Sequence, residues 1–302
     1  MIFIGAGAVK YLGIPDMREF TDQFRKLVAG YRFGLTKPYD EMMRFLQREF
    51  PESADLEGIY TILDSIIQDY YELEIFSSFY YHSIDKSKRG KIPNFNKEKY
   101  RRLFRMLEMF ITDKCWLEPE KKDQILKVFP WWIDAINKIK EIHKYNEEGN
   151  KTNDIVLHSK QYGIQTKPVG PKNLEPLYII TTNYDNVLEN FLEYILKTDY
   201  YNGFDQDGTR KILDFSKIYD EKNRGKLFLL KIHGSIDWKQ LSDKTIVRTS
   251  DPRSSAFEGL EVVRDIVIFP AQKKYLYYDK FLELLYHFKM ILRSSNMWFF
   301  IG

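Results

Sequence analysis

The stretch MIFIGAGAVKYLGIPDMR, residues 1–18, opens with four apolar residues that end abruptly at Gly5-Ala6-Gly7. A short apolar run before a glycine turn is typical of a buried strand that leads into a phosphate-binding turn, because small residues let backbone N–H groups approach a pyrophosphate. The ordinary dinucleotide fingerprint has a third small residue where Lys10 stands here. The turn therefore does not indicate an ordinary Rossmann dehydrogenase, and a purely structural glycine turn stays open.

Composition narrows the class of protein. With 302 residues, 44% apolar and 29% charged, the chain has the size and balance of one large ordered domain or two modest ones. The net charge of +3 gives no reason to expect a nucleic-acid or membrane partner. Neither a signal peptide nor a membrane-spanning apolar run is recognisable. The single cysteine, Cys115, excludes a four-cysteine zinc site within this chain and favours the reducing cytoplasm.

The chain divides into a helical part and a part rich in strands. Apolar residues recur every three or four positions in four segments: 39–50, 56–71, 97–111 and 130–145. Strand-like runs follow, and they are residues 177–182, 226–234, 265–270 and 297–302. Together with residues 1–4, this order predicts an α/β fold: a Rossmann-like parallel sheet with helices on both faces and a large helical insertion after the first strand.

This order also predicts the domain boundaries. We expect residues 1–20 and 175–302 to form the sheet domain and residues 21–174 to form the helical insertion subdomain. The apolar side chains expected in the core of the insertion are Phe45, Leu63, Trp131 and Trp132. The insertion should cover the ends of the strands, with a ligand pocket between the two parts.

Polar residues follow three of the predicted strands. Residues 1–4 run into the Gly5-Ala6-Gly7 turn and then into Asp16, residues 177–181 run into Thr182, Asn183 and Asp185, and residues 227–232 run into His233. In parallel α/β sheets, ligands bind at the carboxyl ends of the strands. Any one of these residues could instead cap a helix or satisfy a buried backbone group. Three polar strand ends in one sheet favour a shared binding site.

These three segments, in this order, resemble the sirtuin signature. Gly5-Ala6-Gly7 is followed five residues later by Gly13-Ile14-Pro15-Asp16, with Met17-Arg18 where sirtuins carry Phe-Arg. The segment 181–185, TTNYD, is similar to the Thr-Gln-Asn-Ile-Asp of the family and retains Asn183 and Asp185. His233 before Gly234 matches the catalytic histidine of the family.

The departures from the signature point to one group within the family. Val9 replaces a serine, and one cysteine cannot supply the four-cysteine zinc module of protein-deacylating sirtuins. With the segments TTNYD, KIHGSIDW and FPAQKK and the helical insertion, the chain looks most like prokaryotic sirtuin-like proteins. Characterised members of that group hydrolyse NAD, commonly in antiphage defence.

The resemblance implies roles for individual residues, with NAD as the substrate and without zinc. Asn183 and Asp185 would orient the ribose, the nicotinamide and the attacking water, and His233 would act as general base or as partner of a ribose hydroxyl. The residues implied in cofactor binding are Gly5, Ala6 and Gly7 at the pyrophosphate, Pro15 and Asp16 at the nicotinamide carboxamide, Arg18 near the phosphates or ribose, Thr182, and Gly302. The last strand looks truncated, so Gly302 is expected to open an incomplete NAD-binding turn.

The leading hypothesis is a cytoplasmic NAD+ hydrolase that releases nicotinamide and ADP-ribose. Its regulation would come from homo-oligomer assembly, a partner or a further domain. One alternative is an NAD-dependent protein deacylase or ADP-ribosyltransferase that uses the same residues, and another is a non-catalytic module that binds NAD or ADP-ribose. All three share one site, in which His233 and Asn183 lie within about 15 Å of each other, the span of one nicotinamide nucleoside.

Overall fold

A computed structural model describes most of the chain. The described residues are 1–31, 34–68, 79, 97–118, 121–128, 133, 176–207, 210–215, 218, 227–254, 256–267, 279–295 and 298–301. The predicted core residues Trp131 and Trp132 lie outside them, as do Gly302 and the whole segment FPAQKK, residues 269–274.

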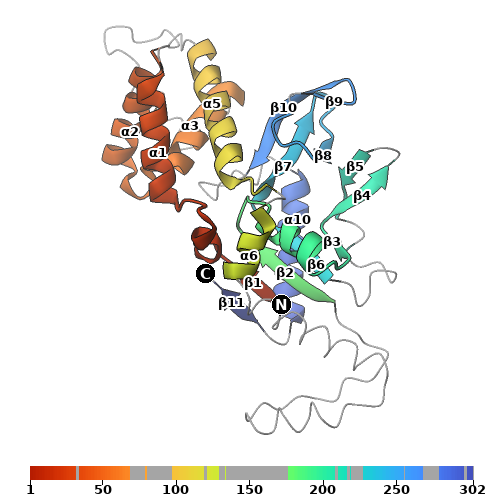
Figure 1. Cartoon of the computed structure of the whole chain (residues 1–302). Helices are drawn as coiled ribbons and strands as arrows, with labels where there is room; N and C mark the ends of the chain where they lie inside the picture. The colour runs from red at the N-terminus through yellow and green to blue at the C-terminus, as the bar shows by residue number, and fades with distance from the viewer. Residues whose placement is uncertain are drawn as a thin grey trace, which may run out of the picture.

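A five-stranded parallel sheet forms the centre of the lower part of the molecule in Figure 1. Its strands, in spatial order, are β11 (Phe299–Ile301), β1 (Ile2–Ile4), β2 (Leu177–Thr181), β6 (Leu227–Lys231) and β3 (Tyr200–Tyr201). Every neighbouring pair in this sheet is parallel. The predicted α/β fold, with a parallel sheet and a helical region after the first strand, is confirmed.

Helices cover the sheet and form a separate block above it (Figure 1). The helices at the sheet are the 3₁₀ helix η1 (Ala6–Leu12), α6 (Lys122–Val128), α9 (Val187–Asn190), the π-helix η5 (Phe191–Ile195) and α10 (Asp279–Ser294). The helices of the block are α1 (Met17–Gly30), α2 (Thr36–Glu49), the 3₁₀ turn η2 (Pro51–Ser53), α3 (Leu56–Gln68) and α5 (Lys97–Cys115).

Side chains along each strand point alternately to the two faces of the sheet, and apolar side chains lie on both faces. Tyr178 and Ile180 of β2 pack in one core with Leu284 of α10, whereas Ile179 belongs to another core with Leu188 of α9. Successive strand residues point to opposite faces, so a strand buried on both sides is apolar at every position. The uninterrupted apolar run in β2 therefore reflects helices on both faces of the sheet.

The helical block has its own apolar core. In α1 the side chains of Phe20, Phe24 and Val28 recur every fourth position and are buried on one face. Phe45 of α2 and Leu63 of α3 are also buried, as predicted for the core of the insertion. The division of the chain into two domains stays a prediction.

A second sheet was not predicted. It is antiparallel, and its strands, in spatial order, are β4 (Phe204–Asp207), β5 (Arg210–Leu213), β8 (Ile246–Arg248), β7 (Gly234–Leu241), β10 (Leu260–Val267) and β9 (Ala256–Phe257). Residues 265–270 were predicted to lie in the parallel sheet; for Asp265, Ile266 and Val267 this was wrong, because they pair with β7 in antiparallel register, and residues 268–270 lie outside the described residues. Only two residues join β9 to β10, and a parallel neighbour would need a long crossover.

The helical block and the antiparallel sheet meet along α5. The Asp265 carboxylate on β10 accepts a hydrogen bond from Thr112 of α5 at 3.2 Å and binds the Lys239 ammonium of β7 at 2.5 Å. The backbone N–H of Asp265 donates to the Glu108 carboxylate at 3.3 Å. These contacts fix one side of the block against the strands. Within the described ranges, no helix is both long and apolar enough to cross a bilayer.

Candidate functional site

The carboxyl ends of β1, β2 and β6 are level with one another. Ile4 is aligned with Thr181, and Thr181 is aligned with Lys231. The Thr181 hydroxyl donates to the Ile4 carbonyl at 2.8 Å, and the Ile232 N–H donates to the Thr181 carbonyl at 3.0 Å. The polar residues that follow each strand therefore emerge at one edge of the sheet.

Asn183 occupies the middle of this edge. Its side-chain amide donates to the Gly5 carbonyl at 3.2 Å, and its backbone N–H donates to the Thr181 hydroxyl at 3.0 Å. Only 6% of the residue is exposed, and its side-chain carbonyl oxygen, Oδ1, has no hydrogen-bond partner among the described residues. A buried acceptor without a donor is costly, so this oxygen marks a position that a ligand or water donor would satisfy.

His233 lies in the turn between β6 and β7. Gly234 has φ +77°, and a Cβ there would lie 2.1 Å from the Ile266 carbonyl oxygen, so the turn requires glycine. The imidazole lies 6.3 Å from the Tyr184 ring, centroid to centroid, and forms a hydrogen bond with the Thr182 backbone. Burial lowers the pKa of His233 to about 4 against that hydrogen bond. The ring is therefore neutral near pH 7.

The structure brings Asn183 and His233 together. Thr182 and Tyr184, the two sequence neighbours of Asn183, both contact the His233 ring. This placement follows from the alignment of β2 and β6, because each residue lies two positions beyond the aligned pair Thr181 and Lys231.

Glu57 reaches the same edge from the helical block. It lies in the first turn of α3, and its carboxylate forms a hydrogen bond with the Tyr184 side chain. Burial, reinforced by the nearby Asp55, raises the pKa of Glu57 to about 7 against the effect of Tyr184. Sequence reasoning missed this residue, since an acidic side chain at a helix start is ordinarily a charge that suits the helix dipole.

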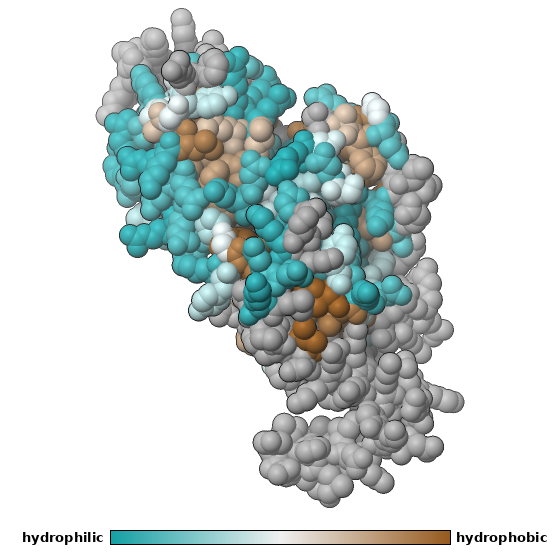
Figure 2. Space-filling view, viewed as in Figure 1, coloured by the Kyte–Doolittle hydropathy of each residue, from teal (hydrophilic) through white to brown (hydrophobic). Residues whose placement is uncertain are grey.

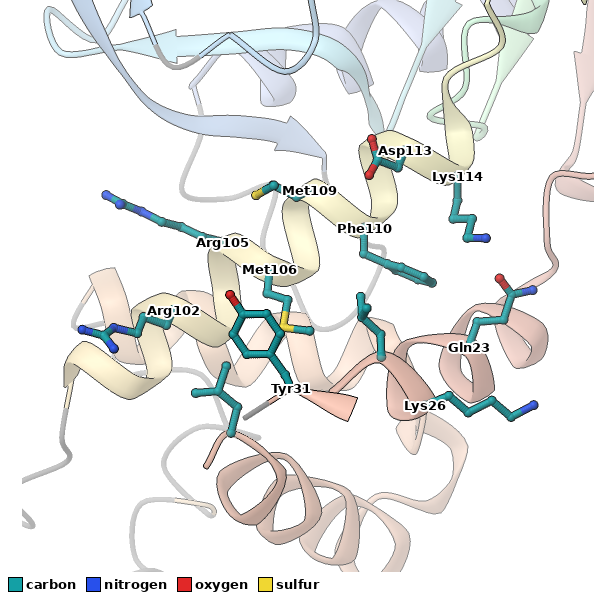
Figure 3. Close-up of a pocket in the computed structure, with 12 residues that line it drawn as sticks. Gln23, Lys26, Tyr31, Arg102, Arg105, Met106, Met109, Phe110, Asp113 and Lys114 are labelled. Atoms are coloured by element: carbon teal, nitrogen blue, oxygen red, sulfur yellow. The ribbon is translucent and has the colours of Figure 1, made fainter. Parts of the chain in front are cut away.

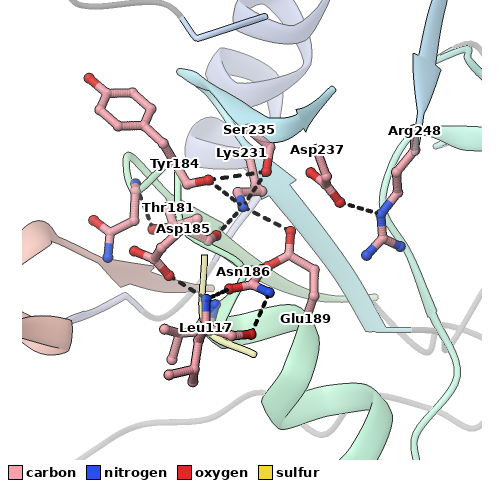
Figure 4. Close-up of polar contacts among 12 residues, drawn as sticks. Leu117, Thr181, Tyr184, Asp185, Asn186, Glu189, Lys231, Ser235, Asp237 and Arg248 are labelled. Carbon is pink, nitrogen blue, oxygen red and sulfur yellow. Dashed lines mark hydrogen bonds and ion pairs between the residues drawn. The ribbon is translucent and has the colours of Figure 1, made fainter. Parts of the chain in front are cut away.

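A buried cation lies directly behind this edge (Figure 4). The Lys231 ammonium is 1% exposed and pairs with the Glu189 carboxylate at 2.8 Å. It also donates to the Ser235 hydroxyl at 2.7 Å, the Tyr184 carbonyl at 3.3 Å and the Asp185 carbonyl. Sequence reasoning did not single out Lys231 or Glu189, whose positions within a strand and a helix carry no motif.

Asp185 interacts with both Asn183 and Lys231. Its carboxylate accepts a hydrogen bond from the Val187 N–H at 3.0 Å, at the start of α9, and another from the Asn183 side chain. Burial raises the pKa of Asp185, although Lys231 and these hydrogen bonds act in the opposite direction. The residue is 3% exposed. Its contacts suit a group that holds Asn183 in place.

The other predicted residues of the first segment are used differently. Asp16 caps α1 by accepting a hydrogen bond from the Glu19 N–H at 3.0 Å, and its carboxylate binds Lys10 at 2.5 Å. Pro15 is partly exposed and Arg18 is exposed. Ala6 and Gly7 begin η1, directly after Gly5. The cofactor roles of these residues stay predictions, and Gly302 lies outside the described residues.

The described residues contain no group of three or more histidine, cysteine or acidic side chains that could hold a metal ion. Burial raises the pKa of the Cys115 thiol, so this cysteine stays protonated. The expected lack of zinc stays a prediction.

Part of the chain is similar to a known family. A family model described as a SIR2-like domain matches residues 178–296, which include Asn183, Asp185 and His233. No curated protein matches the chain at a significant level. The match supports a sirtuin-like family and an NAD-related function for this part of the protein.

Proposed function

We propose that the protein is an NAD+ hydrolase that cleaves the bond between nicotinamide and ribose at the carboxyl edge of the parallel sheet. Two observations carry the proposal: the buried Oδ1 of Asn183 has no hydrogen-bond partner among the described residues, and the neutral imidazole of His233 follows the neighbouring strand at the same sheet edge. Asn183 Oδ1 can accept a hydrogen bond from a substrate hydroxyl group, and the uncharged His233 imidazole is suited to activate a hydroxyl group or water.

The ribose of NAD has such hydroxyl groups. We assign Asn183 to a ribose hydroxyl, which would donate to Oδ1, while the Asn183 amide stays on the Gly5 carbonyl at 3.2 Å. Asp185 holds the asparagine from behind through its own hydrogen bond. The Gly5 carbonyl contacts Asn183, and Ala6 and Gly7 follow it at the start of η1, where backbone N–H groups would receive the pyrophosphate.

His233 supplies the base in this proposal. A ring nitrogen donates to the Thr182 backbone, which leaves the second nitrogen as an acceptor. In hydrolysis the bond from the anomeric carbon to the nicotinamide nitrogen breaks, and the nicotinamide takes the electron pair. A water oxygen bonds to the anomeric carbon and gives its proton to His233, which returns it to solvent. The products are nicotinamide and ADP-ribose.

NAD depletion in prokaryotic antiphage defence follows from the sequence resemblance alone. A cytoplasmic location and regulation by self-assembly, a partner or a further domain likewise stay predictions.

The test is NAD consumption by the purified full-length protein with and without an acetyl-lysine peptide. We expect nicotinamide and ADP-ribose to accumulate in equal amounts without the peptide. Nicotinamide release only in the presence of the peptide, with O-acetyl-ADP-ribose as product, would favour the deacylase instead. Tight NAD binding without turnover under every condition tested would favour a regulatory module.

A further inference from the structure

A groove on the helical block is separate from the sheet edge. It lies between α1 and α5, has a volume of about 1080 Å³, and is open to solvent (Figure 3). Its lining is largely apolar, and the apolar side chains are Leu27, Tyr31, Leu35, Met106, Met109 and Phe110. Leu27 is 42% exposed, Tyr31 46% and Met109 67%.

These exposures are high for large apolar side chains that lie together. Figure 2 shows apolar residues at the surface of the helical block with hydrophilic residues around them. An exposed apolar group with a polar rim is characteristic of a binding surface. The two methionines add a lining that adapts its shape to a partner.

The rim of the groove is basic. Its charged side chains are Lys26, Arg102, Arg105, Lys114 and Asp113. The one carboxylate, Asp113, forms an ion pair with Arg253 at 2.9 Å, which neutralises its negative charge. Neither Lys26 nor Arg105 forms an ion pair with a described residue, whereas Arg102 pairs with Glu98 at 2.9 Å. The rim is therefore complementary to a ligand with negative charge.

The positions of the cations limit the shape of that ligand. Arg102 and Arg105 lie toward one end of the groove, and Lys26 and Lys114 lie toward the other (Figure 3). Arg102 and Lys114 are twelve residues apart on α5, which corresponds to about 18 Å along a helix. Met106 and Phe110 lie between them. A nucleotide would bring its phosphates to one cluster of cations, whereas these cations stand at two ends of an apolar floor.

We propose that the α1–α5 groove binds an amphipathic helix of a protein partner, about three turns long, with an apolar face and acidic residues at both ends. A helix in a hydrophobic groove buries residues at i, i+3, i+4 and i+7, which matches an apolar floor of this length. The acidic ends fix the register of the bound helix, and the basic rim disfavours partners whose ends are also basic. The proposal does not depend on the reaction at the sheet edge.

The test uses two model peptides on the full-length protein. Both are 14-residue helical peptides with leucines at i, i+3, i+4 and i+7; one has two glutamates at each end and the other has lysines at the same positions. We expect the glutamate peptide to bind at least about 10-fold more tightly by fluorescence anisotropy, and its affinity to fall as salt is raised. Equal binding of the two peptides would overturn the proposal.

Variants locate the binding. Replacing Arg105→Glu and Lys114→Glu together should weaken the glutamate peptide at least about 10-fold, whereas Arg101→Glu, an exposed α5 position outside the groove, should not. Leu27→Ser with Met109→Ser should weaken it as well, which simple charge attraction would not show. Thermal melting checks that each variant is folded. Unchanged affinity in either double variant would overturn the proposal, as would a single-stranded oligonucleotide that binds the groove more tightly than the peptide.

Discussion

Two groups of buried polar side chains lie at the carboxyl edge of the parallel sheet, and they differ in how far the protein satisfies them. Around Lys231, the ammonium has four acceptors, Glu189, Ser235 and the carbonyls of Tyr184 and Asp185, although the second oxygen of Glu189, Oε2, has no hydrogen-bond partner among the described residues. Around Asn183, the side-chain amide has its acceptor but the carbonyl oxygen has no donor among the described residues.

The difference distinguishes buried polar groups that stabilise the fold from buried polar groups that are available to a substrate, at the same edge of the sheet. A buried charge surrounded by protein partners contributes to the fold. Its removal leaves the partner charge buried and unpaired, which lowers stability. An incompletely satisfied group beside a neutral base is a group available to a substrate. The two groups touch at Tyr184 and Asp185, so the first holds the second in position.

The largest expected effect on stability is at Lys231. Lys231→Met leaves the Glu189 carboxylate buried and unpaired, so we expect unfolding to become easier by roughly 3–5 kcal/mol, measured by denaturant or thermal melting. Lys211→Met, which removes an exposed lysine from β5, is the matched control and should change little. Adding Glu189→Gln to Lys231→Met should recover part of the loss. A Lys231→Met protein as stable as the wild type would remove the structural role of this ion pair.

The smallest expected effect concerns pH and Glu57. Because its pKa is raised to about 7, the folded state holds a proton that the unfolded state releases above about 4.5, and stability falls as pH rises through this window. Glu57→Gln should therefore match the wild type near pH 4.5 and be more stable above pH 7, by about 1–2 kcal/mol after allowance for partial exposure. His233 has the opposite sign: its lowered pKa of about 4 costs stability as pH falls below 6.5.

Melting temperatures of wild type and Glu57→Gln between pH 4.5 and 8 measure this effect. Glu52→Gln removes a nearby exposed carboxylate and serves as the control. If the two glutamine variants have parallel pH profiles, Glu57 does not titrate in the way that its burial implies.

The sequence predicted the site residues that directly follow strands, and it missed the residues that reach the site through contacts between distant segments. Asn183, Asp185 and His233 directly follow apolar strands, and the rule for parallel sheets places them at one edge. The antiparallel sheet was missed because β4, β5, β8 and β9 are only two to four residues long and the longer β7 has polar residues between its apolar ones. β10 was assigned to the wrong sheet because an apolar run does not show the direction of its partner. Glu57 and Lys231 were missed because their contacts join segments far apart in the chain, Glu57 to Tyr184 and Lys231 to Glu189.

The most direct test of the comparison is the turnover of NAD by His233→Ala and Asn183→Ala, with melting temperatures recorded on the same samples. We expect each variant to lose at least about 100-fold in turnover, the scale for a positioned acid–base or orienting group, with a melting temperature near that of the wild type. Val263→Ala, at an exposed position on β10, is the control and should keep its activity. Wild-type turnover in either variant, or a loss of activity that follows only the loss of folded protein, would contradict the catalytic role of this edge.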